Sequence, residues 1–124
     1  MPGITRNRAE RFEDLEVWQK AHICVLDVYK MAKGFPAEEK FGLISQMRRA
    51  AVSIAANIVE GFKKRGQRDK AHFYNVAQGS LEELRYYLIL SKDLGYIEDN
   101  GAVLSSIDEV ARMPHRLLAV IKAG

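Results

Sequence analysis

The chain of 124 residues is 48% hydrophobic and 28% charged, with a formal net charge of +3; it suits one globular domain and is too short for two. Its single cysteine, Cys24, excludes an intramolecular disulfide and fits a reducing compartment. The sequence shows neither an apolar run of about 18 residues that could span a membrane nor a secretory signal pattern, so we expect a cytoplasmic protein.

The chain begins with a basic stretch that shows no periodicity. We expect residues 1–11 to form a flexible basic arm and residues 12–124 to form a single domain. The first helix is predicted from Asp14 to Ala32, because apolar residues recur there at spacings of three and four. They cover more than half of the helix circumference, whereas a helix in a monomer needs a band of about 100°. The excess predicts burial on two sides, by the bundle and by another subunit.

Gly34-Phe35-Pro36 is predicted to end the first helix and to start the second, which continues to about Phe62. One face of the second helix is apolar, and its alanines allow another helix to approach closely. The stripe beside that face is polar. We interpret it as a structural hydrogen-bond network that includes a residue of the third helix, with Arg48 or Arg49 as counter-charge. The predicted members are Gln46, Ser53, Asn57, Glu60 and Glu83. An acid–base site formed by the last three of these is the alternative interpretation.

A dense cluster of charge follows the second helix. The segment from Lys63 to Lys70 has five basic residues and one acidic residue. Lysine and arginine side chains at phosphates release counterions, so this segment predicts contact with a nucleic-acid backbone. The predicted nucleic-acid-binding residues are Arg48, Arg49, Lys63, Lys64, Arg65, Arg68 and Lys70. The other interpretation of the segment is a solvated loop that only keeps the protein soluble.

The third helix is predicted from about Asp69 to Leu94. Its Gly79-Ser80 pair indicates close packing against the alanine-rich face of the second helix. The segment from Tyr86 to Leu90 is apolar or aromatic nearly all round, which again predicts burial on two sides.

The fourth helix follows a turn from Gly95 to Gly101 and carries apolar residues at helical spacing. We expect Ser105 or Ser106 to cap it, because Ser106 and Glu109 have the spacing of a capping box. Pro114 has no backbone N–H and is expected to kink the helix or to split it into two segments.

Signals of catalytic chemistry are sparse in this sequence. A dinuclear metal site in a helical bundle needs two Glu-x-x-His motifs, and the sequence contains none. His22 and Cys24 are two residues apart and cannot face the same side of a helix, so they are not a nucleophile–base pair. We therefore predict no catalytic, cofactor-binding or metal-binding residues, and a protein that is not an enzyme.

The second predicted helix carries the most specific motif of the chain. Arg48-Arg49-Ala50-Ala51-Val52-Ser53-Ile54, followed by Asn57-Ile58 and Glu60-Gly61, resembles the signature of the four-helix-bundle family named after 23S rRNA intervening sequences. The similarity runs from about Phe12 to Ile97. The resemblance implies a small up-down bundle, and some similar proteins are homopentamers. A distantly similar protein, the accessory variability determinant of diversity-generating retroelements, binds nucleic acid and a reverse transcriptase.

The sequence departs from the family pattern in two places. Ala55-Ala56 stands where the family often has Pro-Ser, which favours a helix without a kink. Arg85 stands where an acidic residue is common, so a negative surface feature is not expected at that position.

Together these features predict an all-α protein, an antiparallel up-down four-helix bundle. We expect a homo-oligomer, a pentamer by the resemblance, that associates with RNA or DNA through its basic residues. A protein–protein scaffold with no nucleic-acid role is the alternative function. A salt titration of RNA binding separates the two functions, because phosphate contacts weaken steeply with salt.

Overall fold

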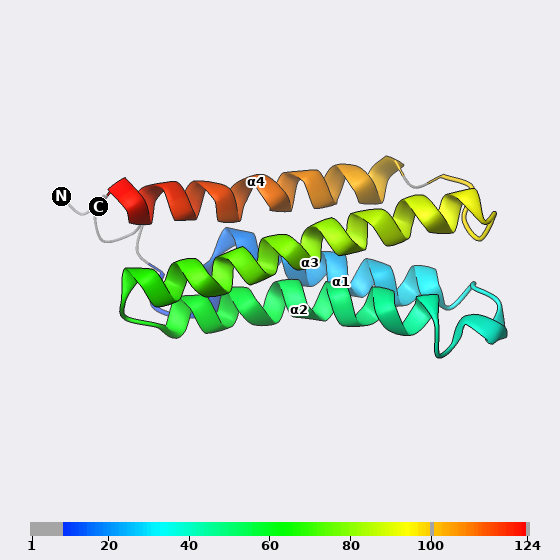
Figure 1. Cartoon of the computed structure of the whole chain (residues 1–124), viewed down its shortest axis with the longest axis horizontal. Helices are drawn as coiled ribbons and strands as arrows, with labels where there is room; N and C mark the ends of the chain where they lie inside the picture. Colours follow the sequence, from blue (N-terminus) through cyan, green and yellow to red (C-terminus); the bar gives the residue numbers. More distant parts are fainter. Residues whose placement is uncertain (1–8, 100, 124) are drawn as a thin grey trace.

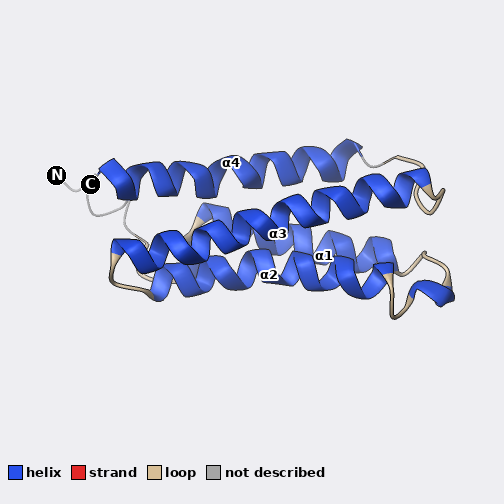
Figure 2. Ribbon diagram, viewed as in Figure 1, coloured by secondary structure: helices blue, strands red, loops and turns tan. Residues whose placement is uncertain are grey.

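Four α-helices make up most of the computed structural model, which describes residues 9–99 and 101–123, with side chains up to residue 112. Their bounds are Glu16–Ala32 for α1, Leu43–Lys63 for α2, Gln67–Asp93 for α3 and Gly101–Ala123 for α4. Successive helices run in opposite directions (Figure 1), and the described residues contain no strand (Figure 2). The predicted all-α four-helix bundle is confirmed. The arm predicted over residues 1–11 lies largely outside the described residues.

The core is built from one apolar face of each helix. Helical spacing puts Met47, Ala51, Ile54 and Ile58 on one side of α2, and each of them is at most 1% exposed. The opposing side chains include Val28 of α1, Leu84 and Leu88 of α3, and Ile107 of α4. Burying one large apolar side chain contributes roughly 1.5–3 kcal/mol, so this shared interior is the main source of stability. Each of α1 and α3 packs against α2 and α4, which places α1 and α3 at opposite corners of the bundle.

α2 and α3 form the most extensive helix pair, and a glycine allows their close approach. A side chain at position 61 would place its Cβ 2.5 Å from a ring carbon of the buried Tyr74, so Gly61 leaves the room that this ring occupies. The sequence predicted this role for Gly79, and that prediction is wrong. Gly79 is exposed, and a Cβ there would meet nothing within 4 Å. Its neighbour Ser80 does pack against α2, as expected.

A hydrogen-bonded cluster joins the two helix connections at one end of the bundle. The Tyr96 hydroxyl donates to the Glu39 carboxylate at 2.7 Å, and the Leu43 backbone N–H donates to the same carboxylate at 3.1 Å. The Phe35 and Tyr96 rings pack with their centroids 5.3 Å apart. The Tyr96 hydroxyl and then the Leu43 N–H lower the pKa of Glu39, and the carboxylate raises the pKa of Tyr96. The cluster therefore holds the α1–α2 connection, with its short helix η3 (Ala37–Glu39), to the segment after α3.

α4 starts earlier than its sequence predicts. Its first residue is Gly101, whose backbone N–H donates to the Asp99 carboxylate at 2.8 Å. Ser105 and Ser106 lie inside the helix, so the predicted cap at these serines is wrong. A carboxylate just before a helix satisfies a free N–H as a serine hydroxyl does, and here that carboxylate stands ahead of the serines.

α4 is also continuous. It extends through Pro114, so of the two outcomes predicted there, a kink or a split into two segments, the split is wrong. Proline removes one backbone N–H, whereas the apolar spacing on both sides of it favours a single helix. α2 differs in the opposite way, because η3 and a turn precede Leu43 and delay its start beyond Pro36.

Gly61→Ala is expected to destabilise the bundle by about 1–3 kcal/mol, because the new methyl group would overlap the buried Tyr74 ring. Gly34→Ala is the matched control. Its Cβ would meet only a carbonyl oxygen at 3.7 Å, so its effect should stay within about 0.5 kcal/mol. Urea unfolding followed by circular dichroism measures both changes. Equal stability of the two variants would show that Tyr74 moves aside without cost.

Tyr96→Phe is expected to lower the free energy of unfolding at pH 7 and to have a smaller effect in acid. The pKa of Glu39 in the native protein lies below its unfolded value of about 4.3. The hydrogen bonds that the Glu39 carboxylate accepts therefore contribute fully to stability at a pH above the unfolded pKa. This contribution is lost as the pH falls through the native pKa. Denaturant unfolding of both proteins at pH 7 and below pH 4 measures the effect. A difference that does not narrow in acid would contradict this role of Glu39.

Candidate nucleic-acid interface

The basic segment forms a tight turn between two helices. α2 ends at Lys63 and α3 begins at Gln67, so only three residues connect the two helices. In Figure 1 this connection lies at the same end of the bundle as the start of α1 and the end of α4. Most of the segment is therefore held on helix ends rather than in a long loop.

Two of the five basic residues take part in the fold itself. Lys70 donates from Nζ to the carbonyl oxygens of Gly61 and Phe62, at 3.0 and 2.9 Å, and so caps the C-terminal end of α2. Partial burial lowers the pKa of Lys70. The Nζ of Lys64 lies 5.2 Å from the centroid of the Phe73 ring. These two lysines stabilise the turn and are less available to a partner.

The three other basic residues of the segment face solvent. Lys63, Arg65 and Arg68 are exposed, and none of them has an ion pair within the described part of the chain. We call these three residues the basic end. Asp69, the one acidic residue of the segment, lies in the first turn of α3, where the helix dipole favours a negative charge. Exposed cations on both sides of a tight turn suit phosphate oxygens, which lysine and arginine bind without reading sequence.

Arg48 and Arg49 lie on the side of the bundle. Arg49 precedes Lys63 on α2 by fourteen residues, which is roughly 21 Å along the helix. The Arg48 guanidinium lies 4.6 Å from the centroid of the Tyr29 ring on α1, and its buried Nε has no hydrogen-bond partner among the described residues. Arg49 is exposed. The structure therefore does not bring these two arginines together with the basic end.

The polar network between α2 and α3 has three members. The Ser53 and Ser80 hydroxyls share a hydrogen bond of 2.8 Å, and Asn57 donates from Nδ2 to the Ser53 carbonyl and hydroxyl oxygens at 2.8 and 3.0 Å. The sequence did not predict Ser80 as a member, although a serine among the apolar residues of α3 is a signal for one. The remaining predicted members are exposed and lie outside this network: Gln46, Glu60 and Glu83. The three hydrogen-bonded residues carry no charge, so they need no arginine as counter-charge and form no acid–base pair.

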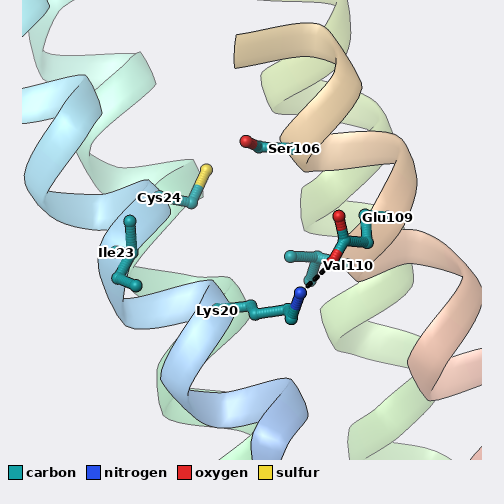
Figure 3. A pocket seen from close by; sticks show the side chains of 6 residues that line it. All are labelled: Lys20, Ile23, Cys24, Ser106, Glu109 and Val110. Carbon is teal, nitrogen blue, oxygen red and sulfur yellow. Dashed lines mark hydrogen bonds and ion pairs between the residues drawn. The ribbon is translucent and has the colours of Figure 1, made fainter. Parts of the chain in front are cut away.

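A hollow of about 170 Å³ lies between α1 and α4 (Figure 3). Lys20 and Glu109 form an ion pair there; their hydrogen bond is the main reason that the pKa of the lysine is raised and that of the glutamate lowered. Burial raises the pKa of the Cys24 thiol to about 11, so the thiol stays protonated at neutral pH. The hydroxyl of Ser106 also lines this hollow, and no hydrogen bond joins it to a basic side chain among the described residues.

The described residues hold no group of three or more His, Cys, Asp and Glu side chains that could bind a metal ion. None of the helices, as far as they are described, has the length and apolar character needed to cross a membrane. His22, the histidine nearest to Cys24 in sequence, is exposed and stacks on Trp18 with ring centroids 5.0 Å apart. The basic end, with three exposed cations that have no ion pair among the described residues, is the candidate interface.

Asn57→Ala is expected to lower the free energy of unfolding by about 0.5–1.5 kcal/mol, because it removes both hydrogen bonds to Ser53. Glu60→Ala is the control on the same helix. Glu60 is exposed and has no ion pair among the described residues, so its loss should change stability by less than about 0.5 kcal/mol. Thermal unfolding measures both variants. A loss for Glu60→Ala as large as that for Asn57→Ala would return Glu60 to the network.

Comparison with known proteins agrees with the fold and with the sequence motif. A crystal structure of a protein of unknown function from the S23 ribosomal protein family of Bacteroides thetaiotaomicron is similar, with a TM-score of 0.74 and 22% sequence identity. The similarity covers 82% of this chain and 97% of that one. A search of curated proteins found no match. Arg85 forms an ion pair with Asp108 of α4 at 3.1 Å. Since residues 13–116 match the family described as 23S rRNA-intervening sequence protein, the chain belongs to that family.

Proposed function

We propose that this chain is a non-enzymatic, homo-oligomeric protein that binds the phosphate backbone of nucleic acid through its basic end. The observation that carries the proposal is the exposure of three unpaired cations at one end of the bundle: Lys63, Arg65 and Arg68. Lys64 and Lys70 hold the turn that presents them. A preorganised turn loses less conformational entropy on binding than a flexible loop does.

The expected partner is a phosphate backbone rather than a particular base sequence. Lysine and arginine at phosphates fix position and carry no sequence information, so we expect little sequence preference. The name of the family refers to 23S rRNA, which makes structured RNA the first probe to use.

Exposed apolar side chains support the homo-oligomer. The large hydrophobic residues exposed in the described part of the chain are Ile23, Leu26, Tyr29, Phe41, Val52, Val76, Tyr86, Ile89 and Leu94. Several of them lie on α1 and α3, the helices whose sequences predicted burial on two sides. Soluble monomers rarely expose contiguous apolar patches larger than a few hundred Å². The resemblance to the family suggests a pentamer.

The same exposed residues favour a second candidate, a protein–protein scaffold. In that function the apolar side chains bind another protein, and the basic end serves only solubility. Both candidates predict weak RNA binding at low salt, because any positive surface attracts a polyanion. Only the steepness of the salt dependence, and its change on mutation, separates them.

A triple variant with Lys63, Arg65 and Arg68 changed to Ala is expected to bind structured RNA more weakly and with a flatter salt dependence. Each phosphate contact contributes about 0.7–0.9 to the slope of log K against log salt concentration, so three lost contacts should reduce the slope by about 2–3. Fluorescence anisotropy with a labelled RNA hairpin at several KCl concentrations measures the slope.

The matched control changes Lys30, Lys33 and Lys92 to Ala. These lysines are exposed near the opposite end of the bundle and carry the same total charge. The control should lower long-range attraction slightly and keep the wild-type slope. If both triple variants have the wild-type slope, or the same reduced slope, the basic end is not the contact and the scaffold function remains.

A further inference from the structure

The outward side of α3 carries a stripe that the packing of the chain does not explain. At spacings of three and four, its members are Asn75, Gly79, Glu82, Tyr86, Ile89 and Asp93, and all of them are exposed. Tyr86 is 58% exposed and Ile89 is 43% exposed. Gly79 weakens the middle of this 27-residue helix, and a Cβ there would meet nothing within 4 Å. Large apolar side chains beside bare backbone suit the close approach of another helix.

A second exposed surface lies across α1 and α2. We call it the arginine face, and it consists of the half-buried Arg48 and the exposed Leu26, Tyr29, Arg49 and Val52. Among its apolar members, Leu26 is 55% exposed, Tyr29 is 40% exposed and Val52 is 42% exposed. The Arg48 guanidinium is held against the Tyr29 ring, and the described residues give it neither a hydrogen bond nor an ion pair. A guanidinium fixed on an aromatic ring and left unpaired is ready to bind a carboxylate.

The α3 stripe and the arginine face carry opposite charges. The stripe contains Glu82 and Asp93 and no basic residue, and neither carboxylate has an ion pair within the described residues. The arginine face contains two arginines and no acidic residue. Contact between two copies of the same surface would bring like charges together, whereas contact between one of each would pair opposite charges. Because α1 and α3 occupy opposite corners of the bundle, one chain can present both surfaces at once.

We propose that the α3 stripe of one copy docks on the arginine face of a second copy, where Glu82 accepts hydrogen bonds from the Arg48 guanidinium. The contact is head-to-tail, so each copy uses both surfaces, and the assembly closes into a ring or extends as a filament. Gly79 lets the backbone of α3 approach the second copy, and Tyr86 and Ile89 cover its exposed apolar residues. This proposal rests on the homo-oligomer proposed above and adds the interface that forms it.

A charge-reversal cycle tests the contact. Glu82→Arg and Arg48→Glu should each reduce the mass found by light scattering at micromolar concentration to the 14.0 kDa of one chain. A chain with both substitutions carries an opposite-charge pair at every contact and should reassemble. Wild-type mass in both single variants, or failure of the double variant to reassemble, would overturn the proposal.

Two further variants separate loss of contact from loss of folding. Glu83→Arg makes the same charge change on the next residue, which lies off the stripe, and should keep the wild-type mass. Gly79→Trp has open space in the single chain, so it should retain the helical circular dichroism of the wild type and still lose the oligomer. An oligomeric Gly79→Trp variant would overturn the proposal.

The behaviour of the wild-type chain distinguishes this interface from the proposed function. A monomeric wild type refutes both the interface and the homo-oligomer, and leaves the two surfaces to a different protein partner. An oligomeric wild type that none of the substitutions dissociates refutes only the interface. Loss of mass in Glu82→Arg, Arg48→Glu and Gly79→Trp, with recovery in the double variant, supports both.

Discussion

The close packing of α2 against α3 is the constraint on which the rest of the bundle depends. Gly61 makes room for the Tyr74 ring, and the hydrogen bond between Ser53 and Ser80 crosses the same interface. Because only three residues join the two helices, the connection is too short to allow one helix to move far along the other. A register shift of one residue would place the next residue of α3 at each contact position, which corresponds to a rotation of about 100° around the helix axis. Leu84 would then leave the core. α1 and α4 then pack on faces whose positions are already set.

The same short turn determines which cations of the segment make contacts within the fold and which remain exposed. The last carbonyl groups of α2 have no partners in their own helix, and Lys70 supplies two hydrogen bonds to them. Lys64 rests on an aromatic ring, so the remaining cations of the segment form the basic end. Among the described residues, the buried polar side chains include the hydroxyls of Ser80 and Ser91, which do not change charge near neutral pH. An interior of this kind is consistent with the surface binding proposed above.

Apolar spacing predicted all four helices, because burial of one face leaves a periodic trace in the sequence. It could not identify the glycine at the helix contact, because Gly61 and Gly79 differ in their surroundings in the fold. The Tyr74 ring lies against Gly61, whereas nothing lies within 4 Å of a Cβ at position 79. The polar stripe correctly included Ser53 and Asn57, but a long glutamate such as Glu60 can extend into water from the edge of the same contact. The basic segment shows the same limit, because its five cations look equivalent in the sequence. Only the structure shows that Lys70 binds carbonyl groups of α2 and that Lys64 lies on the Phe73 ring.

The proposed docking through the sides of the bundle and the proposed binding at its end are compatible in one chain. The α3 stripe and the arginine face run along the helices, whereas the basic end lies beyond them, so an assembly built through the sides leaves the basic end free. In a ring whose axis follows the helices, every copy would place its basic end on the same rim, and the local positive potential would exceed that of one chain. Repulsion along that rim opposes assembly, and bound phosphates would relieve it. By linkage, nucleic acid would then stabilise the oligomer by the same factor by which assembly strengthens the binding of nucleic acid.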